Sequence, residues 1–405
     1  MNSAGALLLI PNFRAASPAN GVFVIGKKFL EGMNAYTCQW PGAVEVALLV
    51  DPDAKREPDA CEVRVKDLPF AIHCFPSSTA ELVQLLRRAS AVNAALCSEF
   101  THLSEGCQKL GVPLIYTAEQ TLRTRKQIVC AETRNPLLRV RRIYWTTQTE
   151  GRYLRALRVA RGVQCNGTPV YEAYRTINAN PLLFFDTRVS QEMVVPESML
   201  NARLSELLAG AALRLVFSGR LVAIKGVDHL PLVARELRRL RVPFTMDIYG
   251  LGDLATSLRS RIASLGLSEV VRLRGFLDFK TQWIPQVSRS ADLFVCCHRQ
   301  GDPSCTYLEA MSCGLPIVGY DNEAFHGIRA LSQAGWEVPM DNPRQLAEVI
   351  ARLSQDREQV ATASRTARWF AAAHTFESEF KKRIDHMLVC SEAADESCSG
   401  LRTAQ

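Results

Sequence analysis

Long apolar runs and export signals are missing from this sequence. No run of hydrophobic residues reaches the ~18 that a membrane-spanning helix needs. The opening residues, MNSAGALLLIPN, have no basic segment ahead of a short apolar run, which predicts a first strand and not a secretion signal. These absences argue against an integral membrane protein and predict a cytoplasmic one.

Paired cysteine motifs are also missing. The 13 cysteines show no C-x-x-C pairs and no even spacing, so we expect reduced thiols and no zinc site. Cys296 and Cys297 are adjacent in an expected strand and therefore face opposite ways, which suits packing better than chemistry.

Familiar catalytic sets are absent as well. There is no Ser-His-Asp set, no thiol with an assigned base and no glycine-rich Walker loop. Asp51-Pro52-Asp53 resembles a metal-binding Asp-x-Asp, but it lies in a charged loop, and we expect no metal there. No recognised nucleic-acid-binding module accompanies the net charge of +7.

What is present is an alternation of strands and helices. A chain of 405 residues, 47% hydrophobic and 22% charged, is long enough for two globular domains. The alternation predicts an α/β protein with doubly wound sheets in both halves. We expect domains over 1–195 and 196–370, a last helix over 371–390 that crosses back to the first domain, and a disordered tail over 391–405.

The most informative stretch is 291–321, which reads as a buried strand, a loop, a short helix and a second strand. Asp302 and Pro303 predict the start of the helix, and Gly314 predicts its end. Free N–H groups at such a start face the carboxyl end of the strand, where α/β sheets bind phosphate. We therefore expect the N–H groups of Ser304, Cys305 and Thr306 to face a phosphate.

Glu309 lies in an otherwise apolar part of this helix. A buried carboxylate without a partner costs several kcal/mol. We expect Glu309 either to have a partner, which is a cation or the paired hydroxyls of a ribose, or to face solvent.

Positive charge is concentrated in one stretch. Between Arg123 and Arg161 there are eleven Arg or Lys residues and only two acids, Glu132 and Glu150. Arg152, Arg155 and Arg158 follow helical spacing beside Leu154 and Leu157. The stretch is either a solvated helix face or a surface that attracts an anionic membrane or a phosphate-bearing acceptor.

Four segments of the second half resemble the donor-binding domain of retaining GT-B glycosyltransferases, in the group 1 family (glycosyltransferase family 4). The segments are SGRLVAIKGVDHL from Ser218, DIYGLGD from Asp247, VVRLRGFL from Val270, and PSCTYLEAMSCGLPIVGYDNEA from Pro303. The first half matches only in layout. The resemblance implies two Rossmann-like domains facing a central cleft, with acceptor and donor on the first and second domains.

The resemblance also implies roles for individual residues. Arg220 and Lys225 would hold the leaving diphosphate, and Glu309 would bind the ribose hydroxyls. Further donor contacts would come from glycine turns, the base-reading turn and the amides at the helix start: Gly21, Gly219, Gly250, Gly275, Phe276, Leu277, Ser304, Cys305 and Thr306.

The sequence departs from the family pattern at two positions. Counting back from Glu309 places Gly301 where the family has a sugar-contacting glutamate; Asp302 either replaces it or only caps the helix. Where many relatives have a catalytic-site histidine, this sequence has Glu119, which either acts on the acceptor hydroxyl or only begins a helix.

The predicted function is metal-independent, retaining transfer of a hexose-like sugar from a UDP- or GDP-linked donor to a glycan or lipid-linked acceptor. No separate cofactor is expected. The resemblance suggests bacterial surface polysaccharide or glycolipid assembly, at the inner face of the membrane if the basic stretch binds lipid. Two alternatives stay open: a GT-B nucleotide-sugar epimerase, and a GT-B subunit that has lost its catalytic activity and serves as a scaffold.

Overall fold

The computed structural model describes residues 5–54, 60–133, 135–301 and 305–402. The chain divides into two compact units. Unit 1 comprises Met1–Asn166, Val170–Phe184 and Glu377–Gln405, and unit 2 comprises Gly167–Pro169 and Phe185–Phe376. The change from unit 1 to unit 2 thus falls earlier in the chain than the predicted boundary at 195.

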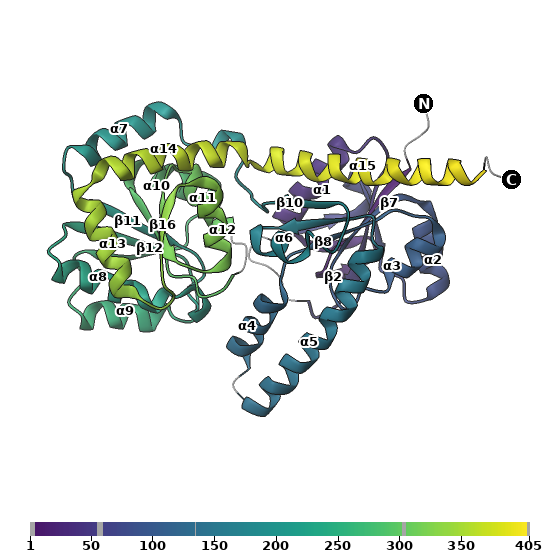
Figure 1. Ribbon diagram of the computed structural model, residues 1–405, viewed down its shortest axis with the longest axis horizontal. Helices are drawn as coiled ribbons and strands as arrows, with labels where there is room; N and C mark the ends of the chain where they lie inside the picture. The colour runs from purple at the N-terminus through teal and green to yellow at the C-terminus, as the bar shows by residue number, and fades with distance from the viewer. Residues whose placement is uncertain (1–4, 55–59, 134, 302–304, 403–405) are drawn as a thin grey trace. The chain divides into compact units, whose positions relative to one another are not determined.

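Unit 1 is an α/β unit with a mostly parallel sheet (Figure 1). Its elements in chain order are β1 (Ala6–Ile10), β2 (Arg14–Ala19), β3 (Val22–Gly26), α1 (Lys27–Gln39), β4 (Val44–Val50), β5 (Ala60–Arg64), η1 (Val65–Asp67), β6 (Ala71–Cys74), α2 (Thr79–Arg88), β7 (Ala89–Ala95), α3 (Leu103–Leu110), β8 (Leu114–Ala118), α4 (Leu122–Glu132), α5 (Pro136–Val159), β9 (Gly162–Asn166), α6 (Thr168–Tyr174), β10 (Pro181–Phe184) and α15 (Phe376–Arg402).

The sheet of unit 1 has the strand order β10-β9-β8-β7-β1-β4-β2-β3-β5, with β6 also paired to β4. Strands β1, β4 and β7 to β10 run parallel, and buried residues of β1, β4 and β7 to β9 form a core with α2, α3, α6 and the end of α5. One expected helix begins later than the sequence suggests. The sequence predicts a helix over Phe23–Met33, but the apolar run VFVI forms β3, which pairs antiparallel with β5, and the helix α1 begins at Lys27.

Unit 2 contains the remaining elements. They are η2 (Gln191–Met193), α7 (Glu197–Leu208), β11 (Leu213–Ser218), η3 (Ala223–Lys225), η4 (Val227–His229), α8 (Leu230–Arg239), β12 (Phe244–Tyr249), α9 (Ala255–Ser264), β13 (Val271–Gly275), η5 (Phe279–Trp283), α10 (Ile284–Ser290), β14 (Leu293–Cys296), α11 (Cys305–Ser312), β15 (Ile317–Tyr320), α12 (Glu323–Ser332), β16 (Gly335–Val338), α13 (Pro343–Gln355) and α14 (Arg357–Ala373).

The sheet of unit 2 is wholly parallel, with the order β13-β12-β11-β14-β15-β16. The first three strands extend the sheet to one side and the last three to the other, so the direction of winding reverses between β11 and β14. In sheets of this kind a crevice forms at the carboxyl ends of the two strands beside the reversal, and ligands bind there.

Helix α15 returns the chain to unit 1, where Phe380 contacts the ring of Tyr36 and Arg383 bonds to Gln164. The helix continues to Arg402, into the stretch for which the sequence predicted disorder. The stretch 391–402 contains no proline, and a proline there would have ended the helix. Within the described residues, no helix combines the length and apolar character that crossing a bilayer requires.

Candidate nucleotide-sugar site

Three glycine turns meet at the carboxyl edge of the sheet in unit 2. The N–H of Gly219 donates to the carbonyl of Tyr249 (3.1 Å), and the N–H of Gly250 donates to that of Gly275 (2.8 Å). A side chain at Gly250 would place its Cβ 1.9 Å from the carbonyl oxygen of Gly219, and the φ of +137° there also requires glycine. The structure therefore brings together Gly219, Gly250 and Gly275, which the sequence predicted as donor contacts.

The two predicted phosphate-binding cations differ in their surroundings. Lys225 ends η3 and is only 7% exposed, whereas Arg220 is exposed. The turn that carries Lys225 is pressed against the end of β14, because a Cβ at Gly226 would lie 1.9 Å from the carbonyl oxygen of Cys297. Lys225 is thus held at the reversal between β11 and β14, where the crevice is expected.

An arginine fixes this turn to the strand end. Arg299 donates to the carbonyl of Ala223 (2.8 Å) and forms two bonds of 2.9 Å with the Asp228 carboxylate. It also donates to Asp341 Oδ1 at 2.8 Å and lies 2.7 Å from His229 Nε2. Burial alone would raise the pKa of Asp228, but the hydrogen bonds and the positive charge of Arg299 lower it below the usual value. Burial, with the charge of Arg299, lowers the pKa of His229.

His298 lies beside Lys225 and was not singled out from the sequence. Its ring is 1% exposed, 5.8 Å from the ring of Tyr307, and its Nε2 has no hydrogen-bond partner among the described residues. Burial and the positive charge of Lys225 hold its pKa well below the usual value. The signal that could have identified His298 is its place directly after a buried strand, at the point where the direction of winding of the sheet reverses.

Glu309 has a cation for a partner. It is 6% exposed on α11, and its Oε1 accepts a hydrogen bond from Arg188 Nε at 2.8 Å. The Arg188 guanidinium also lies over the ring of Phe279, 3.9 Å from its centre. The buried, partnered Glu309 confirms the expectation that this carboxylate would not be left alone, and the alternative of a solvent-facing glutamate is wrong.

A second carboxylate lies where the family motif would place one. A Cβ at the buried Gly301 would come within 2.8 Å of Glu323 Oε2, so the Glu323 side chain fills the space beside Gly301. Glu323 begins α12, in the segment YDNEA, and the sequence analysis gave it no role. Asp302 and Ser304 lie outside the described residues.

The remaining predicted donor residues of unit 2 lie on two elements. Cys305 and Thr306 are half-buried at the start of α11, and Cys305 Sγ is 3.9 Å from Asp186 Oδ2. Gly275 turns the chain at φ +74° after β13; Phe276 beyond it is 69% exposed and Leu277 is half-buried. An exposed aromatic ring beside a turn offers a surface on which a base can stack.

Gly21 and Glu119 belong to unit 1, and their roles stay predictions. Gly21, at φ +72°, forms the exposed turn between β2 and β3, and its carbonyl accepts from the N–H of Val65 (3.0 Å). Glu119 directly follows β8 and is exposed.

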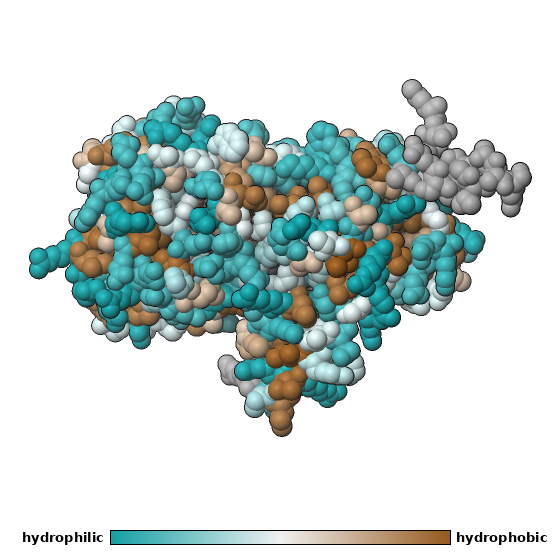
Figure 2. All heavy atoms as spheres, viewed as in Figure 1, coloured by the Kyte–Doolittle hydropathy of each residue, from teal (hydrophilic) through white to brown (hydrophobic). Residues whose placement is uncertain are grey.

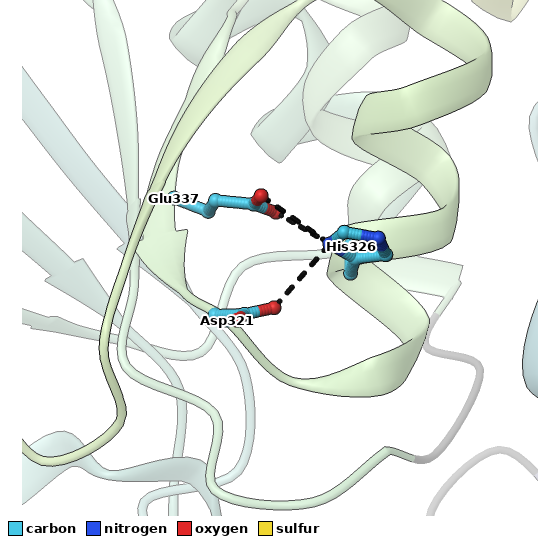
Figure 3. Close-up of side chains that lie close together, drawn as sticks. All are labelled: Asp321, His326 and Glu337. Atoms are coloured by element: carbon cyan, nitrogen blue, oxygen red, sulfur yellow. Dashed lines mark hydrogen bonds and ion pairs between the residues drawn. The ribbon is translucent and has the colours of Figure 1, made fainter.

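Asp321, His326 and Glu337 form another polar cluster of unit 2 (Figure 3). His326 Nδ1 lies 3.1 Å from Glu337 Oε2 and 3.4 Å from Asp321 Oδ1. Arg329 also pairs with Glu337, at 3.1 Å. Because an arginine already competes for this carboxylate, the cluster is accounted for as an ion-pair network.

Comparison with protein families supports this account of unit 2. Residues 203–369 match the family described as "Glycosyl transferases group 1". This part of the chain is therefore similar to a group 1 glycosyltransferase domain. It lies wholly within unit 2 and contains β11 to β16.

Two relatives with assigned roles match over similar lengths. The amylovoran biosynthesis glycosyltransferase AmsK of Erwinia amylovora is 29% identical over 178 residues, which is 42% of each chain. The putative colanic acid biosynthesis glycosyltransferase WcaL of Escherichia coli K12 is 28% identical over 163 residues, 38% of this chain and 40% of WcaL. The match thus spans about two fifths of the length of these relatives.

Solved structures match over almost the whole chain. Anabaena Alr3699/HepE in complex with UDP has a TM-score of 0.63 at 15% identity, covering 95% of this chain and 99% of that one. WaaG, a glycosyltransferase of lipopolysaccharide biosynthesis, has a TM-score of 0.58 at 15% identity, covering 94% and 99%. These similarities show the fold, which is GT-B: two Rossmann-like domains with parallel sheets, as predicted.

Proposed function

We propose that this protein is a glycosyltransferase that moves a sugar from a nucleoside diphosphate donor to a hydroxyl of an acceptor. The observation that carries the proposal is the placement of Lys225: a nearly buried ammonium group, within the part of the chain that matches group 1 glycosyltransferases, at the reversal point of a parallel sheet. Charge that develops on a departing diphosphate would be stabilised there without any rearrangement of the protein.

The chemistry follows from the charges in this half of the chain. Lys225, with Arg220 at the exposed side, would neutralise the diphosphate, and Glu309 would accept hydrogen bonds from the ribose hydroxyls. Arg188 would hold the Glu309 carboxylate in a fixed orientation through its hydrogen bond to Oε1. Since protein cations serve the diphosphate, we propose a metal-independent reaction. The anomeric configuration would be retained, with the acceptor attacking on the face that the phosphate leaves and a phosphate oxygen taking its proton.

For the substrates, the relatives supply the chemical class. AmsK is named for amylovoran biosynthesis and WcaL for colanic acid biosynthesis, and HepE has been crystallised with UDP-glucose. We propose a UDP- or GDP-linked hexose as donor and a glycan or lipid-linked glycan as acceptor. The reaction would then belong to surface polysaccharide or glycolipid assembly.

One observation favours a second candidate, a GT-B subunit without catalytic activity. Gly301 lacks the sugar-contacting carboxylate of the family motif, and Glu119 stands where many relatives have a histidine. The position of Glu323 beside Gly301 weakens this candidate, because it supplies a carboxylate at the same place.

A donor-turnover assay separates the two candidates. UDP- and GDP-sugars are incubated with the protein, and release of nucleoside diphosphate is followed with and without glycan acceptors. We expect turnover with one donor class, and Lys225→Ala to lower kcat/KM by about 10²-fold or more. Lys109→Ala, an exposed lysine of α3 in unit 1, is the matched control and should leave the rate unchanged. Donor binding without any turnover would support the inactive subunit, and unchanged turnover of Lys225→Ala would remove the diphosphate assignment.

A further inference from the structure

Helices α4 and α5 form a hairpin that extends away from the sheet of unit 1 (Figure 1). Asn135 caps α5 by accepting from the N–H groups of Leu137 (3.0 Å) and Leu138 (3.2 Å), and Pro136 follows as the first helical residue. Arg142 donates to Thr133 Oγ1 at 3.0 Å and ties α5 to the end of α4. This bond joins the two helices near the outer end of the hairpin.

The base of the hairpin is anchored in the core of unit 1. The buried residues of α5 are Tyr153, Ala156 and Leu157, all in its last third. Arg125 of α4 lies over the ring of Tyr153, 4.4 Å from its centre, and forms an ion pair with Glu150. Leu157, which the sequence analysis named beside the arginines of this helix, is buried in the core. The packing of unit 1 therefore accounts for the base of α5 but not for its outer part.

That outer part exposes large apolar side chains. Figure 2 shows hydrophobic side chains gathered over the end of the hairpin. The exposed fractions are 82% for Leu137, 41% for Leu138, 67% for Val140, 58% for Tyr144 and 54% for Trp145. On a helix with 3.6 residues per turn these five positions fall within an arc of about 160°, so they form one face. We call these five residues the apolar tip.

The charge on the outer part of α5 has one sign, and the exposed Glu132 at the end of α4 is the acid nearby. Residues 135–149 contain three arginines, Arg139, Arg141 and Arg142, and no acidic residue. Arg141 is exposed within the same arc as the apolar tip. At the base, Glu150 is already paired with Arg125. An apolar face that carries Trp and Tyr, with one arginine within it and others beside it, matches the boundary between the headgroups and the acyl chains of an anionic bilayer.

We propose that the apolar tip inserts into the surface of an anionic lipid bilayer, with the arginines at the level of the lipid phosphates. This goes beyond the basic surface expected from the sequence: the apolar side chains supply the insertion, and the basic residues select anionic lipid. The arginines along α5 keep the helix at the interface. Because vesicle binding requires no turnover, the proposal stands or falls separately from the proposed function.

Vesicle co-sedimentation tests the proposal on the full chain. Vesicles with equal amounts of phosphatidylglycerol and phosphatidylcholine should bind the protein, and pure phosphatidylcholine should bind it far less. Combining Leu137→Ser, Val140→Ser and Trp145→Ser should weaken binding at least about tenfold, since each substitution removes an apolar side chain from the bilayer. Val389→Ser, at a residue 63% exposed on α15, is the matched control and should bind like the wild type.

A second measurement leaves the tip unchanged. In a Trp369→Phe background, which removes a tryptophan that is 69% exposed in unit 2, the summed tryptophan emission of the chain should shift to shorter wavelength with the anionic vesicles, and a Trp145→Phe, Trp369→Phe double variant should show no shift. Unchanged binding of the triple variant, or equal binding to neutral vesicles, would overturn the proposal. The proposal would also be overturned if the chain did not bind vesicles but formed a dimer through the apolar tip, since a second copy of the chain would then cover this face.

Discussion

At the scale of single residues, the two predicted phosphate-binding cations of unit 2 differ in their exposure to solvent, and the sequence does not reveal this difference. Arg220 and Lys225 appear in one loop and look equivalent, yet Lys225 is nearly buried and Arg220 is exposed. The difference arises because Gly226 lets the Lys225 turn approach the carbonyl of Cys297. A long-range contact of this kind has no local sequence signal. Lys225 is therefore the residue on which the diphosphate assignment mainly depends.

The carboxylate that contacts the sugar can be identified by a pair of variants. If Glu323 replaces the glutamate missing at position 301, Glu323→Gln should lower kcat about 10²-fold and Asp302→Asn should change it less than about threefold. The physical reason is the placement of Glu323 Oε2 against Gly301. Steady-state kinetics with the preferred donor measures both. The opposite ranking would assign the role to Asp302, and Glu348→Gln on α13 is a control for loss of an exposed carboxylate.

His298 makes the stability of unit 2 depend on pH. Its pKa is lowered in the folded state, so the folded chain holds it neutral and unfolding lets it take up a proton once the pH is below its unfolded value. Above pH 6.5, the pKa of His298 in the unfolded chain, His298 therefore costs no stability. As the pH falls below 6.5, the free energy of unfolding decreases by up to about 1.4 kcal/mol per pH unit. His229, whose pKa is also lowered, acts in the same direction.

Urea unfolding at pH 7 and pH 5 should show this loss of stability. His298→Phe keeps an aromatic ring beside Tyr307 and removes the titrating group, so its free energy of unfolding should fall less between the two pH values. An equal fall in both proteins would contradict the role given to His298.

At the scale of elements, Arg203 ties α7 to the end of α11. Its guanidinium donates to the carbonyls of Ser288 and Cys313 (both 2.8 Å) and of Gly314 (2.7 Å). Burial lowers its pKa to about 10. The C-terminal carbonyls of a helix carry partial negative charge, so a buried cation is well placed there.

Arg203→Met should lower the free energy of unfolding by about 3 kcal/mol or more, since it leaves buried carbonyls without donors. Arg259→Met, an exposed arginine of α9, should change it by less than about 0.5 kcal/mol. Chemical denaturation of both variants measures the difference. A loss no larger than that of the control would show that water replaces the three bonds.

The elements show where prediction from sequence succeeds and where it stops. The β14–α11–β15 unit followed from a continuous apolar run and from Gly314, both of which are local signals; the predicted helix start at Asp302 and Pro303 lies outside the described residues. The helix expected over Phe23–Met33 begins only at Lys27, because the residues before it pair with β5, far along the chain. Arg188, which partners Glu309 from 121 residues away, could not be anticipated from either segment.

At the scale of the whole molecule, the two-domain α/β design followed from chain length and from the alternation of strands and helices. The assignment to GT-B came from dispersed motifs, which the family and structure comparisons support. Substrate choice has no comparable signal, because it depends on side chains that converge from many segments. Recognition of a nucleoside diphosphate in unit 2 is thus the central claim.

Calorimetric titration with UDP, GDP and the matching monophosphates tests that claim most directly. We predict one saturable site for one of the two diphosphates, at least about tenfold weaker binding of its monophosphate, and loss of this preference in Lys225→Ala, because Lys225 would act on the second phosphate. Equal affinity for monophosphate and diphosphate in the wild type, or an unchanged preference in Lys225→Ala, would contradict it.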